Sequence, residues 1–120
     1  MRFVETTVAG AWVVEPERHE DDRGFFARTW DATVFAERGL SSAFVQSSVS
    51  YNRRRGTLRG MHYQVAPHEE AKLVRCTAGA IFDVAVDLRP GSVSFMQWFG
   101  VELDADNRLA LYVPEGCAHG

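Results

Sequence analysis

Residues 72–88 read KLVRCTAGAIFDVAVDL, which is two runs of β-forming side chains on either side of a short turn. The dipeptide Ala78-Gly79 suits a two-residue hairpin turn, because glycine readily adopts the backbone angles that such turns require. The segment therefore predicts a hairpin of two antiparallel strands, Lys72–Thr77 and Ala80–Leu88.

The register of this hairpin brings charged side chains together. If the turn holds only two residues, Lys72 faces Ala85, and Asp83 and Asp87 lie diagonal to Lys72 within reach of its long side chain. We expect Lys72 to contact Asp83 or, failing that, Asp87. Apolar side chains alternate with the two aspartates, so the aspartates should face solvent, a partner or a pocket, while the core lies against the other face, formed by Phe82, Val84 and Val86.

Further β-rich runs, each closed by turn residues, flank this hairpin: Phe3–Val8, Trp12–Glu15, Phe44–Asn52, Thr57–Gln64, Phe95–Leu103 and Ala110–Val113. Their spacing is that of a sandwich or barrel rather than of alternating βα units. One short helix is predicted over Ala32–Arg38, with Asp31 as its N-cap and Gly39 at its end. We expect an all-β fold, an antiparallel jelly-roll sandwich, as one domain over residues 1–120.

Composition excludes several classes of protein. A chain of 120 residues can bury one core. Its formal net charge of −3 provides no general attraction for nucleic acid or an anionic membrane. No stretch has the pattern of a leader or a membrane span. The two cysteines, Cys76 and Cys117, lack metal-binding spacing, so we expect reduced core residues in a cytoplasmic protein.

The densest chemistry lies in GTLRGMHYQ, residues 56–64. Arginine binds phosphate through two parallel donors, and histidine can take up a proton near neutral pH. Arg59 and His62 would lie on opposite faces of a regular strand. A bulge at Gly60 would bring both side chains to one side.

Lys72 is the single lysine among thirteen cationic side chains; the other twelve are arginines. An ammonium group is a compact point charge, suited to a developing oxyanion, whereas a guanidinium group is broad and planar. We interpret Lys72 as a functional residue rather than as a chance surface lysine.

The segment Pro114–Gly120, PEGCAHG, resembles the second sequence motif of the cupins. Half of the first cupin motif is present, with Gly56 followed at the expected distance by His62. Metal-binding cupins carry a second histidine where Gln64 stands here. Two other functions therefore remain open: a metal-dependent cupin enzyme that uses His62, Glu69 and His119 as ligands, and a cupin that binds a sugar nucleotide without converting it.

A wider resemblance covers nearly the whole chain. Six blocks, in order, resemble the dTDP-4-dehydrorhamnose 3,5-epimerase family: DDRGFF (21–26), VQ (45–46), GTLRGMHYQ (56–64), KLV (72–74), FDVAVDLRPGS (82–92) and PEGCAHG (114–120). The resemblance implies a homodimeric isomerase with a cupin-like jelly roll. It implies epimerisation at C3, at C5 or at both positions of a dTDP-4-keto-6-deoxyhexose, in deoxysugar biosynthesis of the dTDP-L-rhamnose type.

The resemblance also implies a role for each matching residue. His62 matches the base that removes a proton beside the ketone, and Lys72 matches the residue at the ketone oxygen, where the enolate charge gathers. Independently of the resemblance, the hairpin register makes Asp83 the expected support of Lys72. The nucleotide and diphosphate are expected to contact Arg23, Gln46, Arg59 and His119. Such chemistry requires neither a metal nor a cofactor. We expect no nucleic acid partner and no membrane partner.

Three departures from the family pattern affect the prediction. The family's acid tyrosine, and the aspartate that orients the base, match no residue up to Gly120, so the chain resembles an N-terminal portion that lacks the last strands of the jelly roll. Arg28 stands where the family usually has a glutamate near the nucleotide base. Ser48 replaces a common asparagine.

Overall fold

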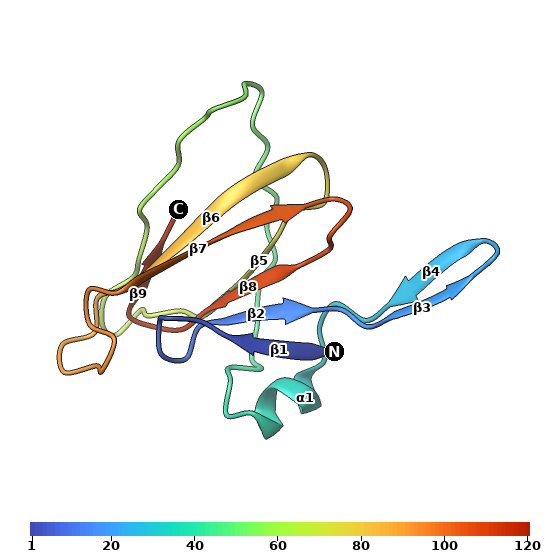
Figure 1. The fold of residues 1–120 in the computed structure, drawn as a ribbon. Coiled ribbons are helices and arrows are strands. Elements are labelled where there is room, and N and C mark those ends of the chain that lie inside the picture. Colours follow the sequence, from blue (N-terminus) through green and yellow to red (C-terminus); the bar gives the residue numbers. More distant parts are fainter.

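The computed structural model describes residues 1–120 as two facing antiparallel sheets with a projecting hairpin (Figure 1). The larger sheet has the strand order β1-β2-β8-β5, the smaller has the order β7-β6-β9, and β3 pairs only with β4. The elements are β1 (Arg2–Glu5), β2 (Trp12–Glu15), β3 (Arg18–Asp21), β4 (Gly24–Ala27), α1 (Ala32–Glu37), β5 (Lys72–Arg75), β6 (Ala80–Asp87), β7 (Trp98–Asp104), β8 (Ala110–Val113) and β9 (Cys117–His119). The predicted all-β antiparallel sandwich is confirmed.

The main core fills the space between the two sheets. Its nine buried residues come from both layers and from the turn before β2: Val8, Ala11, Val13, Cys76, Ala85, Leu103, Leu111, Val113 and Cys117. Burying an aliphatic side chain of this size contributes about 1.5–3 kcal/mol to stability. This interlayer core fixes which side chains of each strand point inward.

The helix α1 covers the outer face of the larger sheet through Phe35, which is fully buried. The ring of Phe35 lies edge to face with Tyr112 of β8, at 5.9 Å between centroids. Asp31 accepts hydrogen bonds from the backbone N–H groups of Thr33 and Val34, as an N-cap does. Gly39, at φ +68°, follows the last turn. The predicted helix and both of its end signals are confirmed.

The predicted hairpin between β5 and β6 is wrong. β5 pairs with β8, with Lys72 opposite Val113, while β6 lies in the other sheet between β7 and β9. The chain crosses between the layers at residues 76–79, where Cys76 is buried in the interlayer core. Burial of apolar side chains between two sheets outweighs the local turn preference of Ala78-Gly79.

The predicted orientation of β6 is also wrong. Asp83, Ala85 and Asp87 face the interlayer core and are at most 3% exposed, whereas Phe82 on the opposite face is 64% exposed. The alternation of side chains correctly divided β6 into two faces. The more hydrophobic face, with Phe82, was wrongly predicted to be the core face. Ala85 is completely buried between the sheets, and both aspartates find polar partners there.

Two predicted strands, Phe44–Asn52 and Thr57–Gln64, do not form. Between Leu40 and Lys72 the chain runs as a long excursion without regular strands, visible as the open green loop in Figure 1. Only His62 joins a sheet, through an isolated bridge to His119. Val45 and Val49 are each 93% exposed, and of this segment's apolar residues Phe44 packs against Phe35 of α1.

The strands β3, β4 and β9 were not predicted. β3 has the sequence RHED and shows no apolar alternation, because the hairpin that it forms with β4 projects away from both sheets and buries no face. β9 is only three residues long and lies within the PEGCAHG motif. A strand pattern can be read from sequence only where one face is buried.

Candidate functional site

The site is organised around the pairing of His62 with His119. The backbone N–H of His62 donates to the carbonyl of His119 at 2.8 Å, and the N–H of His119 donates to the carbonyl of His62 at 3.0 Å. Directly opposed residues of such a pair project from the same face. The two imidazole rings accordingly lie 6.5 Å apart between centroids. Backbone pairing therefore places both predicted functional histidines side by side.

Both histidines belong to the inner side of the sandwich. On the other edge of β9, His119 lies opposite Ala85, which is completely buried in the interlayer core. The ring of His119 is partly buried, while His62, at the outer edge of the sheet, is exposed. The pair therefore lies where the interlayer space opens to solvent.

Lys72 projects into the same space from the opposite sheet. It precedes Val74 by two positions on β5 and lies opposite Val113, and both valines contact the interlayer core. Alternation gives Lys72 the same inward orientation, with 21% of its side chain exposed. His62, His119 and Lys72 therefore face one interlayer space from two sheets.

The predicted contact between Lys72 and Asp83 is wrong. The ammonium group of Lys72 forms an ion pair with Glu70, two residues earlier in the chain. Asp83 instead meets His119, with its Oδ1 3.1 Å from Nδ1 of the ring. Because β5 and β6 belong to different sheets, the diagonal neighbour of Asp83 is the histidine of β9 rather than the lysine of β5.

Gly60 allows the segment before His62 to lie against β9. Its φ is +104°, and a Cβ added there would lie 2.7 Å from the Cα of Gly120 and 2.8 Å from the carbonyl oxygen of His119. The side chain of Arg59 turns toward the excursion, where Nε donates to Asn52 Oδ1 at 2.6 Å. No regular strand passes through Gly60, so the bulge that was predicted to unite Arg59 with His62 does not form.

The chain does not bring Arg23 or Gln46 to the two histidines. Arg23 lies at the tip of the β3–β4 hairpin, is 90% exposed and pairs with Asp21 (Figure 1). Its hydrogen bonds lower the pKa of Asp21 below the ordinary value. Gln46 lies in the exposed excursion. One copy of the chain thus gathers His62, His119, Asp83 and the inward-facing Lys72, but not the whole predicted set.

Comparison with known proteins identifies the family. A family model described as dTDP-4-dehydrorhamnose 3,5-epimerase matches residues 5–120. The chain belongs to this epimerase family. The enzyme of that name from Methanothermobacter thermautotrophicus is 46% identical over 119 residues, which cover 99% of the chain and 63% of the relative. The chain therefore spans about two thirds of the length of such relatives.

Solved structures of similar proteins share this fold. The dTDP-4-dehydrorhamnose 3,5-epimerase of Bacillus anthracis, with TDP and PPi bound, is 43% identical, with a TM-score of 0.90 over 98% of the chain and 67% of its own. A 3'-monoepimerase from Streptomyces bikiniensis, in complex with dTDP-quinovose, is 35% identical, with a TM-score of 0.83 over 95% of the chain and 58% of its own. These structures support the jelly-roll assignment.

The alternative metal site is not assembled in this epimerase-family chain. No three side chains of the ligand-forming types His, Cys, Asp and Glu converge on a point that could hold a metal ion. Glu69 is exposed in the excursion and does not join His62 and His119. Both cysteines are buried and unpaired. No helix has the length and hydrophobicity needed to cross a bilayer.

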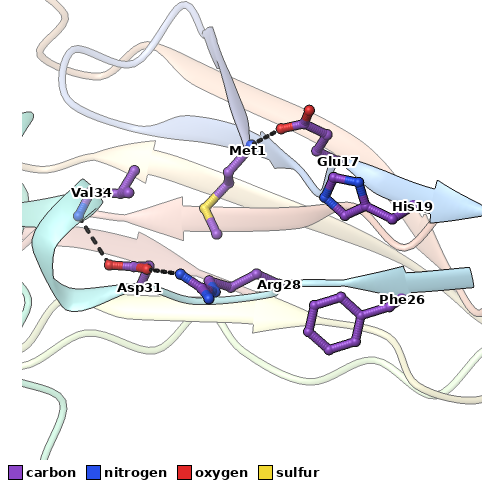
Figure 2. A pocket seen from close by; sticks show the side chains of 7 residues that line it. All are labelled: Met1, Glu17, His19, Phe26, Arg28, Asp31 and Val34. Atoms are coloured by element: carbon purple, nitrogen blue, oxygen red, sulfur yellow. Dashed lines mark hydrogen bonds and ion pairs between the residues drawn. The ribbon is translucent and has the colours of Figure 1, made fainter.

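A separate cavity of about 310 Å³ lies between the base of the hairpin and α1 (Figure 2). Arg28, the residue that departs from the usual family glutamate, projects into it and pairs with Asp31 at 2.5 Å. This pairing lowers the pKa of Asp31. The cavity, which the sequence did not reveal, is lined by Met1, Glu17, His19, Phe26, Arg28, Asp31 and Val34.

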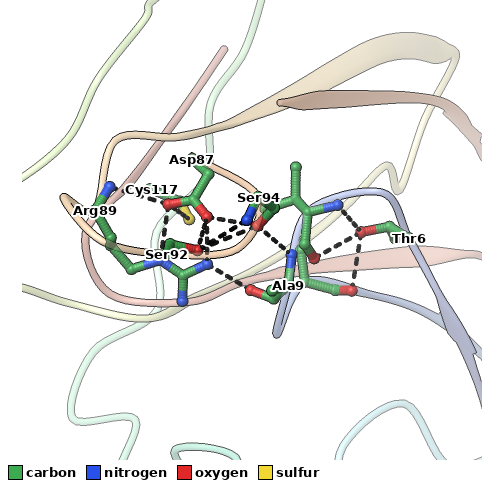
Figure 3. A network of polar contacts seen from close by, with 9 residues as sticks. Thr6, Ala9, Asp87, Arg89, Ser92, Ser94 and Cys117 are labelled. Atoms are coloured by element: carbon green, nitrogen blue, oxygen red, sulfur yellow. Dashed lines mark hydrogen bonds and ion pairs between the residues drawn. The ribbon is translucent and has the colours of Figure 1, made fainter. Parts of the chain in front are cut away.

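A buried polar network surrounds Asp87, at the end of β6 (Figure 3). Asp87 accepts hydrogen bonds from the guanidinium group of Arg89 and from the hydroxyl groups of Ser92 and Ser94. These donors, Arg89 first, hold the pKa of Asp87 far below its ordinary value. Arg89 and Ser94 also bind the backbone of Ala9, so the network ties the loop after β6 to the turn before β2.

Proposed function

We propose that the chain provides the proton-abstracting and enolate-binding groups of a nucleotide-sugar epimerase. The substrate is a dTDP-4-keto-6-deoxyhexose, epimerised at C3, at C5 or at both, in deoxysugar biosynthesis of the dTDP-L-rhamnose type. The observation that carries the proposal is the pairing of His62 with His119, which places two imidazole rings on an interlayer face that Lys72 approaches from the opposite sheet.

In the proposed reaction His62 is the base. Its imidazole takes the proton from the carbon beside the ketone, and the electrons of that C–H bond move to the carbonyl oxygen, which becomes an enolate. Lys72 stabilises the negative charge on this oxygen. Return of a proton to the opposite face of the carbon inverts the centre and restores the ketone. The family resemblance assigns that step to a tyrosine that matches no residue up to Gly120.

No cofactor is needed for this proposal, because the adjacent ketone already acidifies the proton that is removed. His119, partly buried beside His62, is assigned to substrate binding together with Arg59, whose guanidinium group is suited to a diphosphate. The named relatives support this class of ligand, since one structure contains TDP and PPi and another contains dTDP-quinovose.

A homodimer is part of the proposal. The β3–β4 hairpin carries Arg23 away from the histidines of its own chain, and its apolar residues Phe25 and Phe26 are 43% and 68% exposed. A second copy of the chain would cover these side chains and bring Arg23 to a site. We place the enzyme in the cytoplasm, supported by two cysteines that remain unpaired.

Deuterium exchange tests the proposed function directly. The protein is incubated in deuterium oxide with dTDP-4-keto-6-deoxyglucose, and the sugar is analysed by NMR for label at C3 and C5. Label at either position is expected, because abstraction by His62 and return from solvent exchange the proton. If the protein binds the sugar nucleotide but no deuterium enters the sugar, the chain is a binding protein instead. Stoichiometric iron or manganese in the purified protein would favour the metal-dependent alternative.

A further inference from the structure

Two buried aspartates on the inner face of β6 have very different surroundings. Asp87, 0% exposed, uses both carboxylate oxygens and accepts from Arg89, Ser92 and Ser94. Asp83, 3% exposed and four residues earlier on the same face, has one partner, Nδ1 of His119. Its second oxygen, Oδ2, is buried without any hydrogen-bond partner.

A buried carboxylate oxygen without a hydrogen-bond partner, such as Oδ2 of Asp83, destabilises the folded protein. Removing a carboxylate oxygen from water without giving it a donor costs free energy, so buried polar atoms are nearly always paired. Asp87 shows that this fold can satisfy an aspartate completely at a neighbouring inward position. The incomplete pairing of Asp83 is therefore not explained by stability. Its single partner, His119, indicates that Asp83 serves that histidine.

Strand geometry makes Asp83 and His119 neighbours. Val84 and Gly120 exchange both backbone hydrogen bonds, at 2.8 and 3.0 Å, which fixes the register of β6 against β9. His119 is thereby opposite Ala85, and Asp83 is its diagonal neighbour on the same face. The ammonium group of Lys72, the partner expected from the sequence, is bound by Glu70 instead. Asp83 thus directs its only hydrogen bond at the imidazole.

We infer that Asp83 is a positioning residue, which holds the His119 ring through Nδ1 and so presents Nε2 to the substrate beside His62. An ionised carboxylate can only accept, so Nδ1 keeps its proton and donates the hydrogen bond to Asp83. The hydrogen bond at one ring nitrogen sets the proton state of the other. Asp83 therefore fixes both the rotation of the ring and which nitrogen remains free. The inference rests on the proposed function only for the identity of the substrate at Nε2.

The proton position can be measured without substrate. Long-range ¹H–¹⁵N correlation spectra of the labelled protein are recorded at mildly alkaline pH, with His119→Ala identifying the signals of the ring. We expect a protonated Nδ1 for His119 in the wild-type protein, and its loss in Asp83→Ala. Glu102→Ala, which removes an exposed carboxylate from the opposite face of the same sheet, should leave the spectrum unchanged. An unprotonated Nδ1 in the wild-type protein would overturn the inference.

The effect on the ligand is measured by titration with dTDP. His119→Ala and Asp83→Ala should each raise the dissociation constant about tenfold, the scale of one charge-assisted hydrogen bond. The double variant should bind no more weakly than either single variant, because Asp83 acts through His119. A further loss in the double variant would show that Asp83 acts independently and would contradict the inference.

Asp83→Asn covers the case in which Asp83→Ala does not fold. It keeps the volume and one acceptor oxygen, so it should retain the Nδ1 proton and bind dTDP with an affinity between those of the wild-type protein and His119→Ala. Affinity equal to that of the wild-type protein with a displaced Nδ1 proton would overturn the inference. A wild-type protein that does not bind dTDP would contradict the proposed function, while the NMR result would still decide the role of Asp83.

Discussion

Arg89 binds both carboxylate oxygens of Asp87, with Nε 2.8 Å from Oδ1 and the terminal nitrogen 2.8 Å from Oδ2. Ser92 and Ser94 donate to the same carboxylate, which is fully buried. Because the network also holds the backbone of Ala9, it joins the loop after β6 to the turn before β2. Its contribution to stability can be separated from any role in catalysis.

Asp87→Ala should destabilise the fold by about 3–5 kcal/mol, since it leaves the Arg89 guanidinium without its buried partner. The free energy of unfolding is measured in urea with wild-type and variant protein. Asp106→Ala removes an exposed carboxylate that makes no side-chain hydrogen bond and should change stability by less than about 0.5 kcal/mol. A loss for Asp87→Ala as small as that of the control would show that the network is dispensable.

Stability should fall in acid because of the same residue. The ordinary pKa of an aspartate is 3.8, and hydrogen bonds from Arg89, Ser92 and Ser94 lower the folded-state pKa of Asp87 well below it. A group with a lowered folded pKa stabilises the protein above its unfolded pKa, and this stabilisation is lost as the pH falls toward the folded value. Urea unfolding between neutral pH and pH of about 2 should show a steeper acid loss for wild type than for Asp87→Asn. Parallel curves would remove Asp87 from the acid response.

His62→Asn should abolish deuterium exchange into the keto sugar while dTDP affinity changes little, because the variant removes the base and keeps a side chain of similar polarity. The rate of label uptake by NMR and the dissociation constant by calorimetry are measured on the same preparation. If affinity falls as much as exchange does, His62 holds the site together rather than moving the proton.

Arg59→Ala should have the opposite signature. It removes a forked donor suited to a diphosphate, so dTDP should bind at least about tenfold more weakly, while exchange at saturating substrate should persist. Arg75→Ala, a change at an exposed arginine that makes no ion pair, controls for a general loss of positive charge. Equal dTDP affinities for wild type and Arg59→Ala would remove Arg59 from the binding site.

The sequence predicted the fold best where a local signal and burial agree. β2, β8 and the capped helix α1 lie at their predicted positions because their apolar side chains face a core of this same chain. The sequence did not predict which strands pair with each other. Ala78-Gly79 has the composition of a tight turn, yet burial of Cys76 takes the chain across to the second sheet.

The sequence identified two histidines that the structure brings together, but it did not predict their contacts. His62 and His119 were identified from their motifs, and an isolated bridge between distant segments places them together. The partner of Asp83 was missed, because the wrong hairpin assigned Lys72 as its neighbour. The Asp87 network was missed for a different reason, since the Phe and Val residues of β6 suggested the opposite face as the core.

Gly60→Ala should displace His62 and slow deuterium exchange strongly, and Gly56→Ala is its matched control. Both glycines have positive φ, at +104° and +78°, so alanine incurs backbone strain of about 1 kcal/mol at either position. At Gly56 an added Cβ meets nothing within 4 Å, whereas at Gly60 it meets the Cα of Gly120 at 2.7 Å and the His119 carbonyl at 2.8 Å. Only Gly60→Ala therefore forces the segment away from β9 and breaks the backbone pairing of His62 with His119.

Exchange rates and the protection of the His62 amide in hydrogen exchange are measured for both variants. Equal behaviour of the two would mean that positive φ alone explains these glycines and that the close approach of Gly60 to β9 does not hold the base in place.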